Sequence, residues 1–446
     1  MCKIKSHKKS GFTLVEALVG TAVFMILAMS VYQTYTTVLN AVSNSRAKIT
    51  ATALANEQFE IARNLPYAEV GTVGGVPNGK IPAIQNLTRD GKEFKVITTI
   101  RSIDDSFDGT IASTTDLSPA DYKLSELEIS CASCKKFTPI TFTGNIGPRD
   151  LESSSTNGSL FIRVFDASST MPLSNATVQI TNTEIYPSLS TTDVTNNDGL
   201  LQIVDAPPAV DSYYITISKD GYSTEKSYKT GELGTSTPVN QNPTVVVRQL
   251  TQISYFLNYV KDLIIKTQDE NCEAIPNIDL TLKGTRVIGI EPDVLKYNAT
   301  STTGDSGEII IPDLDYDTYS LTINNPEYAL LGTATSTDIV LNASSTEETK
   351  FTLAEKVAGN LLVTVKDSTG LPISDANIEL LIGATSTAME VTGPGAKICR
   401  PEGQALFTGL LPENYNIIVS KTDYINYTGT LDLGVVWQEK EIILNQ

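Results

Sequence analysis

Residues 10–20 read SGFTLVEALVG, and this stretch decides how the fold begins. One carboxylate, Glu16, lies inside a run of apolar or small residues that extends from residue 12 to residue 32. A helix over this run rises about 1.5 Å per residue, which is enough to cross a hydrocarbon core of about 30 Å. A carboxylate at the centre of a bilayer costs about 2.5–3.5 kcal/mol. The stretch therefore predicts a membrane-crossing helix in which Glu16 has a specific purpose.

The residues before this helix form a short basic leader, with lysines at Lys3, Lys5, Lys8 and Lys9. The positive-inside rule keeps that end cytoplasmic and places the rest of the chain outside the membrane. A secretory signal peptide with its cleavage site at residues 28–30 and an ordinary membrane anchor are two simpler interpretations. Neither a signal peptide nor a simple anchor requires a carboxylate at the position of Glu16. Lipoprotein processing is excluded because no cysteine directly follows the apolar run.

The leader, Gly11, Phe12 and the residues TLVE at 13–16 resemble the class III leader of type IV pilins and pseudopilins. The resemblance implies that a prepilin peptidase cleaves between Gly11 and Phe12 and that the new Phe12 amine is methylated. In pilins, the carboxylate at the position of Glu16 is thought to meet the free α-amine of a neighbouring subunit. Such a pair offsets much of the cost of burying each charge alone. Glu16 is therefore expected to direct assembly.

The helix is expected to continue to residue 65, for a length of about 80 Å. Apolar residues at spacings of seven and four predict one apolar face, formed by Val42, Ile49, Ala53, Leu54, Ile61 and Leu65. Pro66 is the predicted stop, because proline cannot continue the hydrogen-bond ladder. Major pilins usually carry a proline inside this helix, and none occurs here. That departure favours a minor pilin or a pseudopilin.

Residues 66–150 are expected to form a small pilin-like β head. The segments 94–100 and 122–129 alternate with the period of half-buried strands. Between them, Asp104, Asp105 and Asp108 are weak candidates for a calcium site. A solvated turn is favoured, because the loop lacks the spaced ligands and terminal Glu of a known calcium loop.

Beyond residue 150 the sequence repeats three times, with expected modules at 151–249, 250–355 and 356–446. Each module opens with a strand-like run, SLFIRVF at 159–165, DLIIK at 262–266 and NLLVTVK at 360–366. Turn glycines follow at Gly199, Gly307 and Gly403. Tyrosines lie 14, 12 and 12 residues later, at Tyr213, Tyr319 and Tyr415, and again nine residues after those, at Tyr222, Tyr328 and Tyr424. This shared spacing indicates one module used three times.

The modules resemble carboxypeptidase regulatory-like domains, which are small transthyretin-like (prealbumin-like) β-sandwiches. The resemblance rests on NDGL at 197–200 with SKDGY at 218–222, and on GQALF at 403–407 with SKTDY at 420–424. The middle module departs from it at residues 326–327. Such modules serve as spacers, carbohydrate binders and adhesin stalks, so the resemblance implies fold more than function. The expected class is α+β and mostly β: leader 1–11, transmembrane helix 12–65, β head and three sandwiches.

Four cysteines remain once Cys2 leaves with the leader, and all four lie on the outer side of the membrane. An even number in an oxidising compartment favours disulfides. Cys131 and Cys134 form a C-x-x-C and are expected to pair locally, with free thiols as the alternative. Cys272 and Cys399 would clamp two neighbouring modules if their Cα atoms lie within about 7 Å. A zinc site would need all four cysteines together.

Charge and composition exclude several functions. The chain has 33 Lys and Arg against 51 Asp and Glu, a net charge of −18, which disfavours nucleic acid as a partner. The one histidine, His7, lies in the leader, so Ser-His-Asp chemistry and histidine-ligated metals are not expected in the processed chain. No cofactor is expected. The remaining enzyme alternative is a carboxylate-based glycosidase with accessory domains.

The leading hypothesis is a non-enzymatic structural subunit, a minor type IV pilin or pseudopilin. It would reside in the inner membrane before assembly and then in an extracellular filament with other pilin subunits. The modules would be displayed for adhesion or partner binding, with an unknown surface or carbohydrate as ligand. The alternative is a pseudopilin of a type II secretion-like system that contacts exported cargo.

Overall fold

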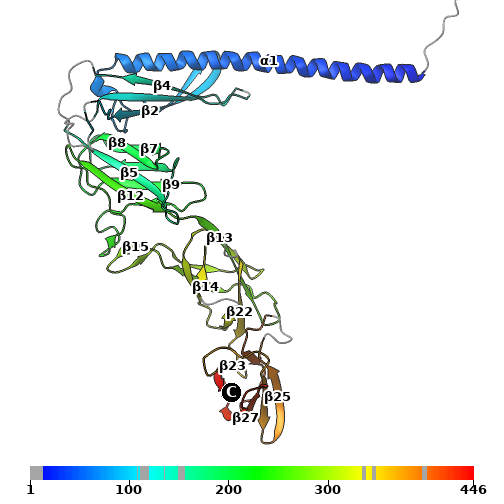
Figure 1. Ribbon diagram of the computed structural model, residues 1–446. Helices are drawn as coiled ribbons and strands as arrows, with labels where there is room; N and C mark the ends of the chain where they lie inside the picture. Colours follow the sequence, from blue (N-terminus) through cyan, green and yellow to red (C-terminus); the bar gives the residue numbers. More distant parts are fainter. Residues whose placement is uncertain are drawn as a thin grey trace, which may run out of the picture.

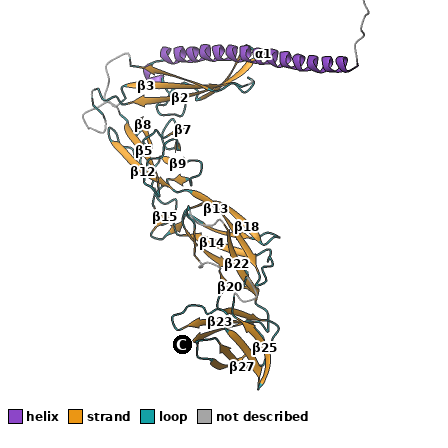
Figure 2. Ribbon diagram, turned by 45° about the vertical axis from the view of Figure 1, so that its right-hand side comes forward, coloured by secondary structure: helices purple, strands orange, loops and turns teal. Residues whose placement is uncertain are grey.

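The computed structural model describes residues 14–107, 109–110, 120–134, 136–148, 156–333, 338–343, 348–393 and 399–446. The molecule is elongated, with a long helix at one end and β-sheets that follow in chain order to the C-terminus (Figure 1). A turned view shows the same β bodies one after another along a stalk (Figure 2). The fold class is as predicted, one long apolar helix followed by a chain that is mostly β. Gly11 and Phe12 lie outside the described residues.

Helix α1 (Leu14–Asn64) has 51 residues and is about 77 Å long at 1.5 Å per residue. It ends just before Pro66, as predicted. Its Ser and Thr hydroxyls donate to carbonyls one turn back, as Ser30 does to Ile26 at 2.9 Å, so these polar groups are satisfied within the helix. By length and composition, α1 is the one helix in the described part of the chain that could cross a membrane.

The head is a four-stranded antiparallel sheet in the order β1-β2-β3-β4, and a short 3₁₀ helix, η1 (Tyr67–Glu69), precedes it. The bounds are β1 (Ile84–Arg89), β2 (Lys92–Ile103), β3 (Tyr122–Ser130) and β4 (Ile140–Ile146). Both predicted head strands are therefore confirmed, as β2 and β3. The C-terminal half of α1 packs on this sheet, against buried Phe94, Val96, Leu127 and Ile129.

The face of α1 that packs on the head matches the predicted one only in part, because Leu54 is buried and Leu65 packs on the head core while the other four predicted residues are exposed. Its buried apolar residues are Ala47, Ala51, Leu54, Ala55, Phe59 and Ala62. Ile49 is 70% exposed, and Val42 and Ile61 are each 47% exposed. The sheet selects alanine because small side chains let the helix backbone approach closely. Val42, Ile49 and Ile61 of the predicted stripe remain on the outer side of the helix.

The first sandwich packs a sheet ordered β10-β9-β6-β7 on one ordered β12-β5-β8. Its strands are β5 (Gly158–Asp166), β6 (Thr177–Asn182), β7 (Leu189–Val194), β8 (Leu200–Ala206), β9 (Tyr214–Ser218), β10 (Glu225–Lys226) and β12 (Leu250–Leu257). Strand β12 runs parallel to β5, with Leu250 opposite Ser159. The first sandwich therefore continues past residue 249, the expected boundary, because β12 completes its sheet.

The second sandwich has sheets ordered β18-β13-β22-β20 and β17-β14-β19-β21. Its strands are β13 (Val260–Gln268), β14 (Asp279–Gly284), β17 (Asn298–Thr302), β18 (Glu308–Asp315), β19 (Thr318–Ile323), β20 (Tyr328–Thr333), β21 (Asp338–Val340) and β22 (Glu348–Glu355). A small linking sheet joins it to the first sandwich. That sheet consists of β11 (Thr237–Pro238), β15 (Val287–Ile290) and β16 (Val294–Leu295).

The third sandwich has sheets ordered β26-β23-β29 and β25-β24-β27-β28. Its strands are β23 (Leu361–Asp367), β24 (Asn377–Ile382), β25 (Thr385–Val391), β26 (Gln404–Phe407), β27 (Asn414–Ser420), β28 (Tyr427–Asp432) and β29 (Gln438–Leu444). In each sandwich the opening strand pairs in parallel with a later strand, as β5 with β12, β13 with β22 and β23 with β29. The three sandwiches thus share one plan.

The repeated glycines and tyrosines have the same roles in all three sandwiches. Gly199, Gly307 and Gly403 have φ of +65°, +67° and +69°. A Cβ at these glycines would lie 2.5, 2.7 and 2.8 Å from a carbonyl oxygen of the opening strand, so only glycine fits. Tyr213, Tyr319 and Tyr415 are buried, and each hydroxyl donates to a backbone carbonyl a few residues upstream, of Pro207, Asp315 and Leu411 respectively. These tyrosines are core residues.

Candidate functional site: a projecting helix and a jointed stalk

The N-terminal half of α1 projects beyond the head (Figure 1). Its large apolar side chains are exposed, for example Leu14 at 82%, Phe24 at 71% and Met29 at 70%. Glu16 lies in the first turn, where the positive end of the helix dipole favours a carboxylate. This half of α1 can bury its apolar surface only in a membrane or against other protein.

The joint between the head and the first sandwich is made by Arg101 of β2. Its guanidinium Nε lies 2.5 Å from Asp193 of β7, and its Nη1 lies 3.0 Å from Glu126 of β3. The hydrogen bonds that Arg101 donates to Asp193 raise the pKa of Arg101 further above its usual value, so the guanidinium stays charged. Arg101 thus ties one face of the head sheet to the outer strand of the first sandwich.

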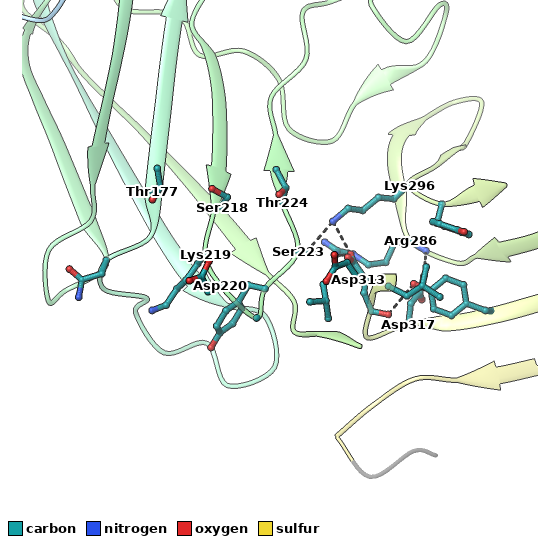
Figure 3. Close-up of a pocket in the computed structure, with 18 residues that line it drawn as sticks. Thr177, Ser218, Lys219, Asp220, Ser223, Thr224, Arg286, Lys296, Asp313 and Asp317 are labelled. Atoms are coloured by element: carbon teal, nitrogen blue, oxygen red, sulfur yellow. Dashed lines mark hydrogen bonds and ion pairs between the residues drawn. The ribbon is translucent and has the colours of Figure 1, made fainter. Parts of the chain in front are cut away.

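A network of four charged side chains joins the first and second sandwiches, and Figure 3 shows its two cations, Lys296 and Arg286. The Lys296 ammonium lies 2.6 Å from Glu225 and 2.8 Å from Asp315. Arg286 contacts the same two carboxylates, at 3.0 Å from Glu225. The side chains of Glu225 and Asp315 are only 6% and 10% exposed. Two cations therefore balance two buried anions across the joint, which is the condition under which buried ion pairs are tolerated.

Beside this network lies a groove of about 740 Å³ between the two sandwiches. Thr177, Ser218 and Thr224 line it from the first sandwich, and Asp313 and Tyr297 line it from the second. The close-up shows Thr177, Ser218 and Thr224 on the first sandwich, with Arg286, Lys296 and Asp313 on the second (Figure 3). The groove is polar and open to solvent.

The joint between the second and third sandwiches is covalent and ionic. A disulfide connects Cys272 and Cys399, whose Cα atoms are 5.4 Å apart. Next to it, Arg400 is 2.7 Å from Glu270 of the second sandwich and 2.7 Å from Glu390 of the third. The Arg400 side chain is only 3% exposed. The two contacts together hold the third sandwich at a fixed position on the second.

The structure also brings Cys131 and Cys134 together, in a disulfide with a Cα–Cα distance of 5.4 Å. Both cysteines pack against the core between α1 and the head sheet, and Cys131 is 6% exposed. The bridge closes the turn after β3. This disulfide belongs to the head and is distant in sequence from Cys272 and Cys399.

Two of the three aspartates named as calcium candidates, Asp104 and Asp105, lie in the loop after β2. The Asp105 Oδ1 accepts a hydrogen bond from the Phe107 N–H at 3.1 Å, and the Asp105 N–H donates to the Asp121 carboxylate. Asp108 lies outside the described residues, and Asp104 is in the same loop. Among the residues that the structure describes, no group of three or more His, Cys, Asp or Glu is placed to hold a metal ion.

Sequence reasoning missed the charged residues of the joints. Arg101, Arg286 and Lys296 lie in strands or turns where nothing in the local pattern distinguishes them from solvated charges. For Arg400 one hint existed, because it directly follows Cys399. Sequence reasoning also missed three buried threonines, each of which caps the second strand of its sandwich through its Oγ1: Thr195, Thr303 and Thr392.

Comparison with known proteins bears on the N-terminus. The family described as the prokaryotic N-terminal methylation motif matches residues 6–32, a segment that contains Gly11, Phe12 and Glu16. The chain thus carries the type IV pilin motif at its N-terminus. No curated protein matches the sequence significantly.

Solved structures similar to the chain include the TIE protein, an ancillary pilin and a shaft pilin. The Bacillus anthracis TIE protein is 14% identical, with a TM-score of 0.20; the match covers 82% of this chain and only 61% of that protein. A streptococcal ancillary pilin is 12% identical, with 65% of this chain and 99% of that one covered and a TM-score of 0.20. The shaft pilin SpaA of Lactobacillus rhamnosus GG is 11% identical, with 45% and 98% covered and a TM-score of 0.18.

Proposed function

We propose that this chain is a minor type IV pilin or pseudopilin, a structural subunit that enters a surface filament through α1. Before assembly, α1 anchors the subunit in the inner membrane with its basic N-terminus in the cytoplasm, and a prepilin peptidase removes residues 1–11. In the filament, the head lies at the surface and the three sandwiches extend outward. The methylation motif over residues 6–32 supports the proposal.

One observation carries the proposal: the two halves of α1 differ in what covers them. The C-terminal half is covered by the head sheet through Ala51, Leu54 and Ala55. The N-terminal half exposes apolar side chains along its whole length and carries Glu16 in its first turn. Burial of this surface is favourable by about 25 cal/mol per Å². A lipid bilayer and a bundle of like helices each provide such burial, and transfer between the two is the step that Glu16 directs.

The stalk supports a display role without catalysis. The cores of the sandwiches are filled by aliphatic and tyrosine side chains, and their joints are fixed by ion pairs and a disulfide. A stalk of this size suits a tip or a sparse position in a helical filament, where it presents the sandwiches for adhesion or contact with a partner. In a secretion-type pseudopilus, the same stalk would contact exported cargo. Deletion of the protein distinguishes the two, through lost attachment or a lost exported protein.

Replacement of Glu16 tests the proposal directly. Glu16→Gln removes the charge and makes the span more compatible with lipid, so membrane insertion should be retained. We expect the variant to accumulate in the membrane and to be reduced at least tenfold in sheared filaments, as measured by quantitative immunoblotting of both fractions.

A matched control is Glu60→Gln, which neutralises an exposed acid near the other end of α1, where Glu60 pairs only with Arg63 across the helix surface. It should enter filaments normally. Wild-type amounts of the Glu16→Gln protein in sheared filaments would contradict the role of Glu16 in assembly.

A further inference from the structure

We propose that the groove between the first and second sandwiches binds an uncharged oligosaccharide. The inference gives a ligand class to the display role proposed above, and it rests on that role for its biological setting. It is argued from the size, rigidity, charge and side-chain chemistry of the groove.

The groove has the dimensions of a ligand site. Its volume of about 740 Å³ lies within the range of about 300–1,000 Å³ for small-molecule pockets. Two separate sandwiches form its walls, so a ligand that fills it contacts both. A chain of two or three sugar rings fits such an open, elongated space.

The two walls are held in place before any ligand arrives. Glu225 of the first sandwich is fixed by Lys296 and Arg286 of the second. The linking sheet pairs Thr237 with Ile290, which is a second tie across the same joint. Tyr222, which lines the groove, stacks on Tyr259 with the ring centroids 4.4 Å apart. A site with fixed walls loses little conformational entropy on binding.

The charges in the groove disfavour an anionic ligand. Arg286 and Lys296 are neutralised by the buried carboxylates described above. Lys219 donates a hydrogen bond to the Ser174 carbonyl at 2.6 Å. Within the described chain, no hydrogen bond or ion pair engages the carboxylates of Asp220 and Asp313, one on each wall. The lining and the charged network hold three cations, Lys219, Arg286 and Lys296, against five carboxylates, those of Asp220, Glu225, Asp313, Asp315 and Asp317. Phosphate, sulfate and sialic acid groups would therefore meet a net negative charge.

The same carboxylates suit a ligand rich in hydroxyl groups. An ionised carboxylate only accepts hydrogen bonds, and its two oxygens can accept from neighbouring hydroxyls. Thr177, Ser218 and Thr224 add hydroxyls that both donate and accept. Tyr297 supplies an aromatic surface on the opposite wall, against which the apolar face of a sugar ring can pack. A neutral sugar matches this combination of acceptors, hydroxyls and one aromatic ring.

The third sandwich provides an internal comparison. Residues 420–424 repeat the loop at 218–222 that forms part of the groove, and Asp423 is exposed there, with φ of +70°. Asp423 takes the position of Gly221 in this loop and does not line the groove. Asp423→Asn is therefore a matched control for changes at Asp220 and Asp313.

The test uses the full-length chain in a detergent whose head group is not a sugar. It is applied to an array of uncharged oligosaccharides, with the sialylated and sulfated forms of the same glycans beside them. We expect binding to one or more uncharged glycans and weaker binding to their charged forms. The double variant Asp220→Asn/Asp313→Asn should weaken binding at least tenfold, measured by isothermal titration with the best glycan from the array.

Asn accepts the φ of +54° at position 313, so the double variant should keep the wild-type melting temperature. Asp423→Asn should bind like the wild type, and Thr224→Trp, which fills the groove, should abolish binding. Absence of binding to every uncharged glycan, stronger binding to the charged forms, or unchanged binding by both groove variants would overturn the inference. Each result is independent of filament entry, which the Glu16 variant reports separately.

Discussion

Gly199, Gly307 and Gly403 occupy equivalent positions in the three sandwiches, in the turn just before β8, β18 and β26 respectively. Each has a positive φ, and each approaches the opening strand too closely for a side chain. For Gly403, a Cβ would lie 2.6 Å from the Cβ of Pro372 and 2.8 Å from the Val365 carbonyl oxygen. These residues could be predicted from the repeated spacing, because turn glycines mark the same bend in every unit.

Replacement of Gly403 by alanine should destabilise the third sandwich by about 2–5 kcal/mol, from left-handed backbone strain and overpacking together. Gly383→Ala is the matched control, since its φ is +65° and nothing lies within 4 Å of a Cβ there. It should cost only the strain, about 1–2 kcal/mol. Urea unfolding can be followed by the fluorescence of Trp437, the one tryptophan. Equal losses of unfolding free energy in Gly403→Ala and Gly383→Ala would contradict the close contact at Gly403.

At the scale of elements, α1 shows what a periodic pattern can and cannot predict. Its start, its apolar character and its end at Pro66 follow from composition and from the properties of proline. The face that meets the head follows only in part, because spacing rules count large apolar residues, whereas four of the six apolar residues buried on this sheet are alanines. The rule chose Ile49, which is 70% exposed, over Ala51, which is fully buried.

This assignment of the helix face makes a testable difference between two neighbouring alanines. Ala51→Leu should overpack the contact with the head sheet and destabilise the head by about 1–3 kcal/mol. Ala53→Leu places the same side chain on the exposed side, where leucine is a good helix former and the change should be close to neutral. Hydrogen exchange of the β2 and β3 amides measures both. Protection lost equally in the two variants would mean that the face is wrongly assigned.

The strands of the sandwiches were predictable because each repeat carries the same alternation, glycine and tyrosine. The parallel partner of each opening strand was not, and for that reason the expected boundary at residue 249 leaves out β12, which completes a sheet of the first sandwich. The joints were also beyond prediction. Arg286 and Lys296 gain their role only when two folded sandwiches bring Glu225 and Asp315 within reach.

At the scale of the whole molecule, the stalk is a series of bodies whose last joint is covalent. The disulfide between Cys272 and Cys399 has a sequence separation of 127, so it encloses most of the second sandwich and part of the third. Tension applied to the two ends of the chain passes through this bond. The enclosed residues cannot extend while the bond is intact, which suits a stalk that carries load.

Single-molecule extension of the full chain should therefore depend on reductant. With the disulfide intact, complete unfolding should release about 450 Å less contour length than after reduction, from about 3.6 Å for each of the 127 residues of separation. The bond between Cys131 and Cys134 spans only three residues and contributes little. The Cys272→Ser/Cys399→Ser variant should give the longer extension with or without reductant. If the extension of the wild type is the same with and without reductant, the disulfide between Cys272 and Cys399 is not formed.

The central claim is that this chain is processed and assembled as a filament subunit. The most direct measurement is the intact mass of the protein recovered from sheared surface filaments. The account predicts a chain that begins at Phe12, carries one added methyl group on its amine and keeps both disulfides. An unprocessed chain that begins at Met1, a chain cleaved after residues 28–30, or the absence of the protein from the filaments would contradict it.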